Sequence, residues 1–232
     1  MINKVKVIAF DADDTLWICE PYFQELNAQF LNMMADFIPP QLAAQELHKT
    51  VGENIALYGY GIKPYSLSMI ETVIRITGEE RSGKYVKKVI ELAQDMLAKP
   101  IELLDDVELV LQSLRSDYRI AVATKGDLLD QERKLKNSGI EHYFHHIEIM
   151  SEKHEDDYSR MIKRLGVAPD EFLMLGNSLK SDIIPVLALG AHAIHIPYYV
   201  TWEFERVEGD VTHPNLKTLT SIKEVLPMLK RN

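Results

Sequence analysis

The feature that most constrains the fold is the uneven spacing of strand-like segments along the chain. Residues 5–10 are nearly all apolar and rich in β-branched side chains, as expected for a central parallel strand covered on both faces. The next clear strand comes only at residues 119–123. The long stretch between them carries helical periodicity with hardly any strand signal. The sequence therefore predicts a sheet whose first strand is followed by a large helical insertion.

Within the insertion, apolar residues recur at helical spacing and are interrupted by clusters of Pro and Gly. The interruptions fall at Pro39-Pro40, around Gly59 to Gly61, and at residues 78–83. The pattern predicts four helices, over residues 21–37, 41–58, 66–76 and 84–97.

After Pro100 the pattern changes to an alternation of helices with short apolar strands, which is typical of βαβ units and a parallel sheet. We expect a doubly wound (Rossmann-like) α/β core formed by residues 1–17 and 100–232, with residues 18–99 inserted as a helical cap. In such sheets ligands bind at the carboxyl ends of the strands. The expected strands are 119–123, 146–150, 172–175 and 192–196, and the expected helices are 104–116, 127–138, 156–165, 179–188 and 219–230.

Composition excludes several classes of function. The 232 residues are 46% hydrophobic and 26% charged, as in an ordinary globular protein. The net charge of −9, with Lys and Arg scattered, argues against nucleic acid or an anionic membrane surface as a partner. The single cysteine, Cys19, rules out an internal disulfide and fits a reducing compartment. With no apolar run long enough for a membrane span and no signal pattern, we expect a cytoplasmic protein of unspecified oligomeric state.

Three carboxylates, Asp11, Asp13 and Asp14, follow the first strand directly. Two unit charges about 4 Å apart repel by roughly 4 kcal/mol at an effective dielectric near 20. Such clustering makes sense where a hard cation binds, or where one carboxylate is a nucleophile and another carries a proton. The sequence therefore predicts chemistry at this strand end.

Polar residues also follow the later strands, and in a parallel sheet all of them should meet at one edge. A hydroxyl, an ammonium and a further carboxylate complete a set suited to handling a phosphoryl group beside Mg²⁺. The residues are Thr124 and Lys125 after the second strand, Lys153 after the third, and Asp182 beyond the fourth.

Together these residues match four ordered motifs, and on them the chain resembles the haloacid dehalogenase superfamily of aspartate-nucleophile phosphohydrolases. Asp11 and Asp13 match the first motif, Thr124 the second, Lys153 the third and Asp182 the fourth. The helical insertion lies where the family's cap lies. The resemblance covers nearly the whole chain.

The resemblance implies a division of labour. Asp11 would attack phosphorus to form an aspartyl-phosphate, and Asp13 would protonate the leaving alcohol and then deprotonate water. Mg²⁺ would be held by Asp11, by the backbone carbonyl of Asp13 and by Asp182. The resemblance thus predicts a Mg²⁺-dependent phosphatase that acts on a small phosphorylated metabolite.

The remaining positions would bind the phosphoryl group. Thr124 would donate a hydrogen bond to it, and Lys153 would hold the nucleophile and balance its charge. The turn at Ala12 and the Thr124-Lys125 peptide can aim backbone N–H groups at phosphate oxygens. The Lys125 side chain either touches substrate, points to solvent or pairs with a neighbouring acid.

Alternatives within and outside the superfamily stay open at this point. A haloacid dehalogenase needs no acid two residues after its nucleophile, so Asp13 favours phosphoester cleavage. A phosphomutase or a phosphonatase would use the same core, and a non-catalytic binding protein could keep the fold. Asn177 stands where many relatives carry an acid, and Asp14 is interpreted as a helix or turn cap.

Overall fold

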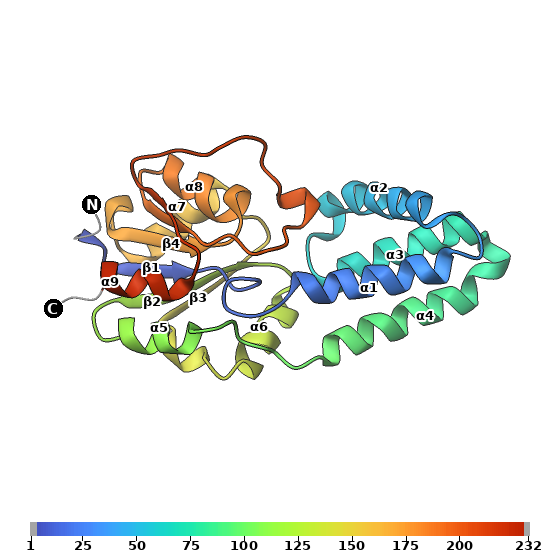
Figure 1. The fold of residues 1–232 in the computed structure, drawn as a ribbon, viewed down its shortest axis with the longest axis horizontal. Helices are drawn as coiled ribbons and strands as arrows, with labels where there is room; N and C mark the ends of the chain where they lie inside the picture. Colours follow the sequence, from blue (N-terminus) through green and yellow to red (C-terminus); the bar gives the residue numbers. More distant parts are fainter. Residues whose placement is uncertain (1–3, 230–232) are drawn as a thin grey trace. The chain divides into compact units, whose positions relative to one another are not determined.

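The computed structural model describes residues 4–229 and divides into two compact units (Figure 1). One unit comprises Met1–Glu20 together with Ile101–Asn232, and the other comprises Pro21–Pro100. The helical insertion is thus a compact unit of its own. Its role as a cap stays a prediction.

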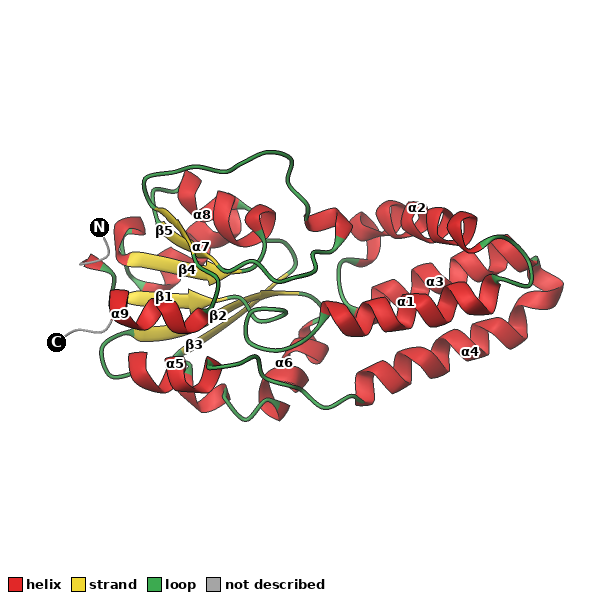
Figure 2. Ribbon diagram, viewed as in Figure 1, coloured by secondary structure: helices red, strands yellow, loops and turns green. Residues whose placement is uncertain are grey.

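The first unit is built on a six-stranded sheet with the order β3-β2-β1-β4-β5-β6 (Figure 2). Every neighbouring pair is parallel. The strand order reverses at β1, which confirms the doubly wound α/β core. The strands are β1 (Val7–Phe10), β2 (Arg119–Lys125), β3 (His146–Met150), β4 (Phe172–Gly176), β5 (His192–His195) and β6 (Leu216–Thr218).

Alternate residues of β1 enter two separate hydrophobic cores, one on each face of the sheet. Ile8 and Phe10 pack into the first core, and Val7 and Ala9 into the second. All four are fully buried, which is why this strand reads as a continuous apolar run. The first core is covered by α5 (Val107–Leu114), α6 (Leu128–Asn137) and α9 (Leu226–Leu229), and the second by α7 (Glu155–Leu165) and α8 (Ile184–Ala188).

The second unit contains the four predicted helices. Contacts between them are apolar and polar: the Phe23 and Tyr65 rings meet edge to face, and the Asn54 amide donates to the Ser68 hydroxyl at 3.1 Å. The third helix starts earlier than predicted because Pro64 falls in its first turn, where proline is tolerated. The helices are α1 (Glu20–Met34), α2 (Pro40–Tyr58), α3 (Ile62–Thr77) and α4 (Glu79–Ala98).

The helix predicted over residues 104–116 begins only at Val107, because the residues of its expected first turn pair with another segment of the chain. The Leu104 N–H donates to the Leu16 carbonyl, and the Ile18 N–H donates to the Glu102 carbonyl. This pairing keeps the chain extended, and Asp106 then adopts a left-handed conformation (φ 62°) before α5 begins.

The predicted helix 179–188 is divided at a proline. Residues Leu179–Ile183 form a π-helical turn, and α8 begins at Ile184. Pro185 has no N–H, so the carbonyl of Ser181 lacks its usual helical partner. The buried Tyr158 hydroxyl donates to that carbonyl at 3.0 Å instead.

Smaller differences lie near the C-terminus and in the loops. The predicted helix 219–230 begins as a 3₁₀ turn at Ile222–Val225 and continues as α9, while residue 230 lies outside the described residues. Strand β6 was not predicted. Short 3₁₀ turns also occur at Glu141–Tyr143, Pro169–Glu171 and Glu203–Glu205. No helix between residues 4 and 229 has the length and apolarity needed to cross a bilayer.

Two glycines provide a matched test of the fold. A Cβ atom at Gly176, the last residue of β4, would lie 2.3 Å from Oδ2 of Asp182, whereas one at Gly83 in α4 would meet nothing within 4 Å. We expect Gly176→Ala to destabilise the protein by about 1–3 kcal/mol, as overpacking does. Gly83→Ala should stabilise it by about 1 kcal/mol, because alanine is the better helix former.

Urea denaturation of both variants measures this difference. In an Asp182→Gly background the side-chain atoms that would meet the new Cβ are all absent, including the Cβ of residue 182 at 2.6 Å, so Gly176→Ala should then cost little. An equal cost in both backgrounds would show that the close approach of Asp182 is not the cause.

Candidate functional site

The predicted site residues meet at the carboxyl ends of the central strands of the sheet. Asp11 directly follows β1, and its N–H still donates to the Leu175 carbonyl of β4 at 2.8 Å. Thr124 lies near the end of β2, and Lys153 follows β3. Asp182 lies in the π-helical turn after β4. The doubly wound topology therefore brings these four residues to one edge.

The Lys153 ammonium joins the two most buried carboxylates of this edge. It donates to Oδ1 of Asp11 and, at 2.7 Å, to Oδ1 of Asp182. The Lys153 side chain is only 2% exposed. Burial disfavours its charge, but the attraction of both carboxylates outweighs burial, and the pKa of Lys153 lies well above its usual range. Residues from three different loops are thereby tied together.

Two carboxylates share this one ammonium, so the cluster carries excess negative charge. Burial and the nearby Asp182 carboxylate raise the pKa of Asp11 to about 7, although Lys153 opposes the shift. The described part of the chain holds no group of three or more His, Cys, Asp or Glu side chains placed to bind a metal. The possible metal ligands at this edge are carboxylate oxygens, which suit Mg²⁺. A backbone carbonyl and water would have to complete the coordination shell of the ion.

Asp182 is held by backbone contacts that depend on the local sequence. The Ser178 N–H donates to its Oδ2 at 2.9 Å, and the Ser178 hydroxyl accepts from the Ser181 N–H at 3.0 Å. Gly176 leaves the space that the carboxylate occupies. The turn thus fixes the Asp182 carboxylate toward Lys153.

Asp13 has a different environment from Asp11. Its Oδ1 accepts hydrogen bonds from Trp17 Nε1 at 2.7 Å and from Lys134 Nζ at 2.5 Å. Its Oδ2 accepts from Gln131 Nε2 at 2.9 Å. Burial alone would raise the pKa of Asp13, but the Lys134 charge and the donated hydrogen bonds outweigh burial and lower it. The two carboxylates after β1 therefore have pKa values shifted in opposite directions.

Thr124 belongs to the Asp13 side of the site. Its buried hydroxyl oxygen accepts a hydrogen bond from Gln131 Nε2 at 3.1 Å. The same amide group also donates to the Lys125 carbonyl at 2.9 Å. Gln131 therefore connects Thr124 with Asp13.

The Lys125 side chain pairs with a neighbouring acid, which is one of the alternatives left open by the sequence. Its ammonium lies 2.7 Å from Oε1 of Glu205 and 3.1 Å from the Ser181 hydroxyl. Glu205 also accepts from the hydroxyls of Ser178 at 2.6 Å and Ser181 at 2.5 Å. This carboxylate therefore ties the end of β2 to the turn that carries Asp182.

The neighbouring polar residues have structural contacts. Asp14 adopts a left-handed conformation (φ 60°), and its carboxylate accepts hydrogen bonds from the N–H groups of Cys19 and Glu20, at the start of α1. This is the capping role expected from the sequence. The Asn177 side-chain oxygen accepts from the Thr15 hydroxyl at 3.4 Å. Ala12 is fully buried, and its carbonyl receives the N–H groups that close the turn.

Four residues of the site were missed by sequence reasoning. Gln131 and Lys134 are three residues apart on α6, so they share a helix face, and that spacing after Thr124 was the available signal. Trp17 is an aromatic residue near the insertion, and its position in the sequence carries no signal of a hydrogen bond to Asp13. Glu205 comes from an irregular segment whose sequence carries no periodic signal.

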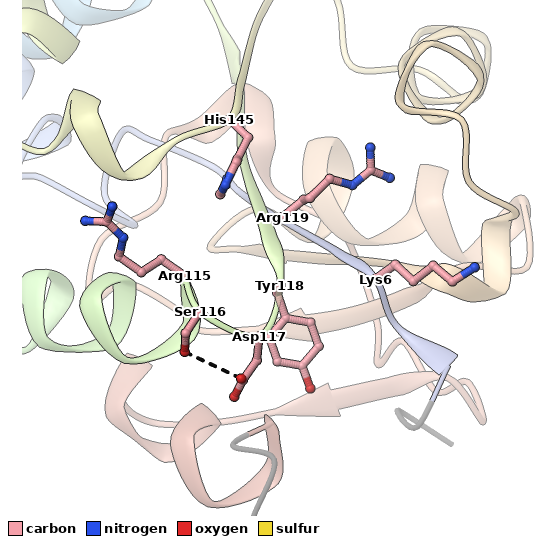
Figure 3. A pocket seen from close by; sticks show the side chains of 7 residues that line it. All are labelled: Lys6, Arg115, Ser116, Asp117, Tyr118, Arg119 and His145. Atoms are coloured by element: carbon pink, nitrogen blue, oxygen red, sulfur yellow. Dashed lines mark hydrogen bonds between the residues drawn. The ribbon is translucent and has the colours of Figure 1, made fainter.

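A pocket of about 380 Å³ lies at the opposite end of the sheet, where β1 and β2 begin (Figure 3). Its cationic side chains are exposed, and Lys6 pairs with Glu171 at 2.5 Å. The pocket shares no residue with the candidate site. Its lining residues are Lys6, Arg115, Ser116, Asp117, Tyr118, Arg119 and His145.

Comparisons with known proteins agree with this architecture. The chain is 25% identical over 226 residues to a glyceraldehyde 3-phosphate phosphatase of Methanothermobacter thermautotrophicus, covering 95% of this chain and 96% of that protein. It is 33% identical over 96 residues to the N-acylneuraminate-9-phosphatase of Mus musculus, covering 39% of each.

Among solved structures, a haloacid dehalogenase-like family hydrolase from Xanthomonas campestris superimposes with a TM-score of 0.87 at 31% identity, covering 98% of this chain and 92% of that one. The family model of the haloacid dehalogenase-like hydrolases matches residues 5–190, which include all four predicted motifs. The chain therefore belongs to the haloacid dehalogenase-like hydrolase family.

Proposed function

We propose that this protein is a Mg²⁺-dependent phosphatase that cleaves a small phosphorylated metabolite through an aspartyl-phosphate on Asp11. The observation that carries the proposal is the buried Lys153 ammonium bonded to both Asp11 and Asp182, with a separately held carboxylate, Asp13, two residues from Asp11. Relatives named as phosphatases support the reaction class.

In the first step an Asp11 carboxylate oxygen attacks phosphorus, and the bond between phosphorus and the ester oxygen breaks. The leaving alcohol takes a proton from Asp13, whose pKa is lowered in the substrate-free protein and would be raised by the approach of the phosphate dianion. In the second step Asp13 takes a proton from water, whose oxygen attacks phosphorus and releases inorganic phosphate and free Asp11. The Thr124 hydroxyl donates a hydrogen bond to a phosphoryl oxygen. Backbone N–H groups near Ala12 and Lys125 donate further hydrogen bonds to the phosphoryl group.

Mg²⁺ would be held by the carboxylates of Asp11 and Asp182 and by the Asp13 backbone carbonyl. It would supply the positive charge that a phosphate dianion needs to approach a carboxylate. The residues fit this role because two carboxylates, Asp11 and Asp182, share only one positively charged group, the Lys153 ammonium. Lys153 holds Asp11 in place and balances part of its charge.

The substrate class follows from the relatives and from the insertion. The two named relatives act on phosphorylated small molecules, by their names. The helical unit Pro21–Pro100 is inserted between β1 and β2, on the C-terminal side of the proposed nucleophile. We assign it the role of a cap that excludes bulk water and admits small substrates, in a protein with one cysteine that suits the cytoplasm.

Phosphate release measured over a panel of sugar phosphates, nucleotides and small phosphoacids tests the proposal. We expect release with Mg²⁺, none after chelation by EDTA, and recovery when Mg²⁺ is added back. Asp11→Asn should abolish release because the amide is not a nucleophile. The matched change Asp156→Asn, at an exposed position of α7, should keep full activity.

Release by Asp11→Asn at the wild-type rate would contradict the proposed nucleophile. Metal-independent chloride release from 2-chloropropionate, without phosphatase activity, would identify a dehalogenase instead. A protein that hydrolyses no ester of the panel would favour a binding role.

The variant Asp13→Asn tests the proton carrier separately, because it keeps the backbone carbonyl assigned to Mg²⁺. We expect kcat/KM for alkyl phosphates to fall by ~100- to 10,000-fold, the usual contribution of general acid–base catalysis. For p-nitrophenyl phosphate the fall should be smaller, because nitrophenolate leaves without a proton. Equal losses for both substrates would refute the acid role of Asp13.

A further inference from the structure

The proposed proton carrier, Asp13, and the proposed phosphate contact, Thr124, are joined by one side chain from α6. The amide of Gln131 donates to Oδ2 of Asp13 at 2.9 Å and to the Thr124 hydroxyl oxygen at 3.1 Å. The Lys125 carbonyl at 2.9 Å is a third acceptor for the same NH₂ group, so its two protons are shared among three acceptors, and the contact with Thr124 is the longest of the three. Gln131 itself is 4% exposed.

We propose that Gln131 is a positioning residue that aligns Asp13 for proton transfer to the leaving group and orients the Thr124 hydroxyl toward the phosphoryl group. This inference rests on the proposed phosphatase activity. It assigns to Gln131 no contact with substrate, because the side chain acts through the two residues that it holds.

The effect on Thr124 follows from hydrogen-bond capacity. A hydroxyl has one proton to donate and oxygen lone pairs that accept. When the Thr124 oxygen accepts from Gln131, its own proton points elsewhere and is available to a phosphoryl oxygen. A site without this amide would leave the hydroxyl free to rotate.

The effect on Asp13 follows from the distribution of donors over its two oxygens. Trp17 and Lys134 both donate to Oδ1, so neither of them contacts the second oxygen of the carboxylate. Gln131 donates to the other oxygen, Oδ2, at 2.9 Å. Donors on both oxygens fix the plane of the carboxylate, as proton transfer in a defined direction requires.

The orientation of the Gln131 amide carries a cost that stability alone does not explain. Its carbonyl oxygen, Oε1, is buried and finds no hydrogen-bond partner within the described residues. A buried acceptor of this kind is unfavourable and calls for a reason. Turning the amide over would place Oε1 against the Asp13 carboxylate, so the requirement to hold Asp13 accounts for the arrangement.

The variant Gln131→Met tests this inference, because it keeps the length and net charge of the side chain but removes its donors. The test compares kcat/KM for p-nitrophenyl phosphate with kcat/KM for the alkyl phosphate that the wild-type protein hydrolyses best. We expect the alkyl-to-aryl ratio to fall by ~10-fold or more, part of the range of general acid catalysis. KM should rise for both substrates because Thr124 loses its orientation.

Two controls and a second variant of Gln131 separate positioning from a general structural effect. Gln112→Met makes the same change at an exposed position of α5 and should leave the ratio unchanged. In an Asp13→Asn background, Gln131→Met should not lower the ratio further, because the residue acts through Asp13. Gln131→Asn keeps the amide but shortens it, so it should reproduce the fall in a protein whose thermal unfolding shows a native fold.

A ratio that stays at the wild-type value in both Gln131 variants would overturn the inference. A fall of equal size with and without the Asp13 carboxylate would overturn it as well. These outcomes differ from failure of the proposed function, in which the wild-type protein itself would release no phosphate from any ester.

Discussion

The buried Lys153 ammonium is the interaction on which the rest of the site depends. It bonds Asp11 after β1 and Asp182 after β4, while Lys153 itself follows β3. Two carboxylates this close would repel each other strongly in a buried place without it. One ammonium serves two carboxylates, and burial together with the Asp182 carboxylate raises the pKa of Asp11 to about 7. The carboxylates that tie these loops together are also the ones that we propose as ligands of Mg²⁺.

Several unusual features of the fold serve this cluster. Gly176 has no side chain, and this leaves the space in which the Asp182 carboxylate lies against the end of β4. The π-helical turn that carries Asp182 ends at Ile183, and the buried Tyr158 hydroxyl donates to the Ser181 carbonyl, which has no N–H partner at Pro185. The glutamate at position 205 then ties this turn to Lys125. The two halves of the sheet edge are thereby joined by side chains as well as by backbone.

The sequence predicted the parts of this structure that have a periodic or local signal. The apolar strands, the helical insertion and the residues after each strand all follow from such patterns, and Asp11 and Lys153 meet as expected. Gln131 and Lys134 were missed because the polar face of a helix is usually exposed to solvent. The contact of this face with Asp13 becomes apparent only in the folded structure. Glu205 was missed because it reaches the site from an irregular segment. Long-range contacts of this kind leave no spacing rule in the chain.

The most direct test of the account is to locate the phosphoryl group during turnover. Protein quenched in acid while hydrolysing its substrate with Mg²⁺ can be digested and examined by mass spectrometry. The account predicts one added phosphoryl group on the peptide that contains Asp11, absent when substrate or Mg²⁺ is omitted. Rapid phosphate release with no phosphorylated Asp11 peptide at any time, or with the group on another residue, would contradict it.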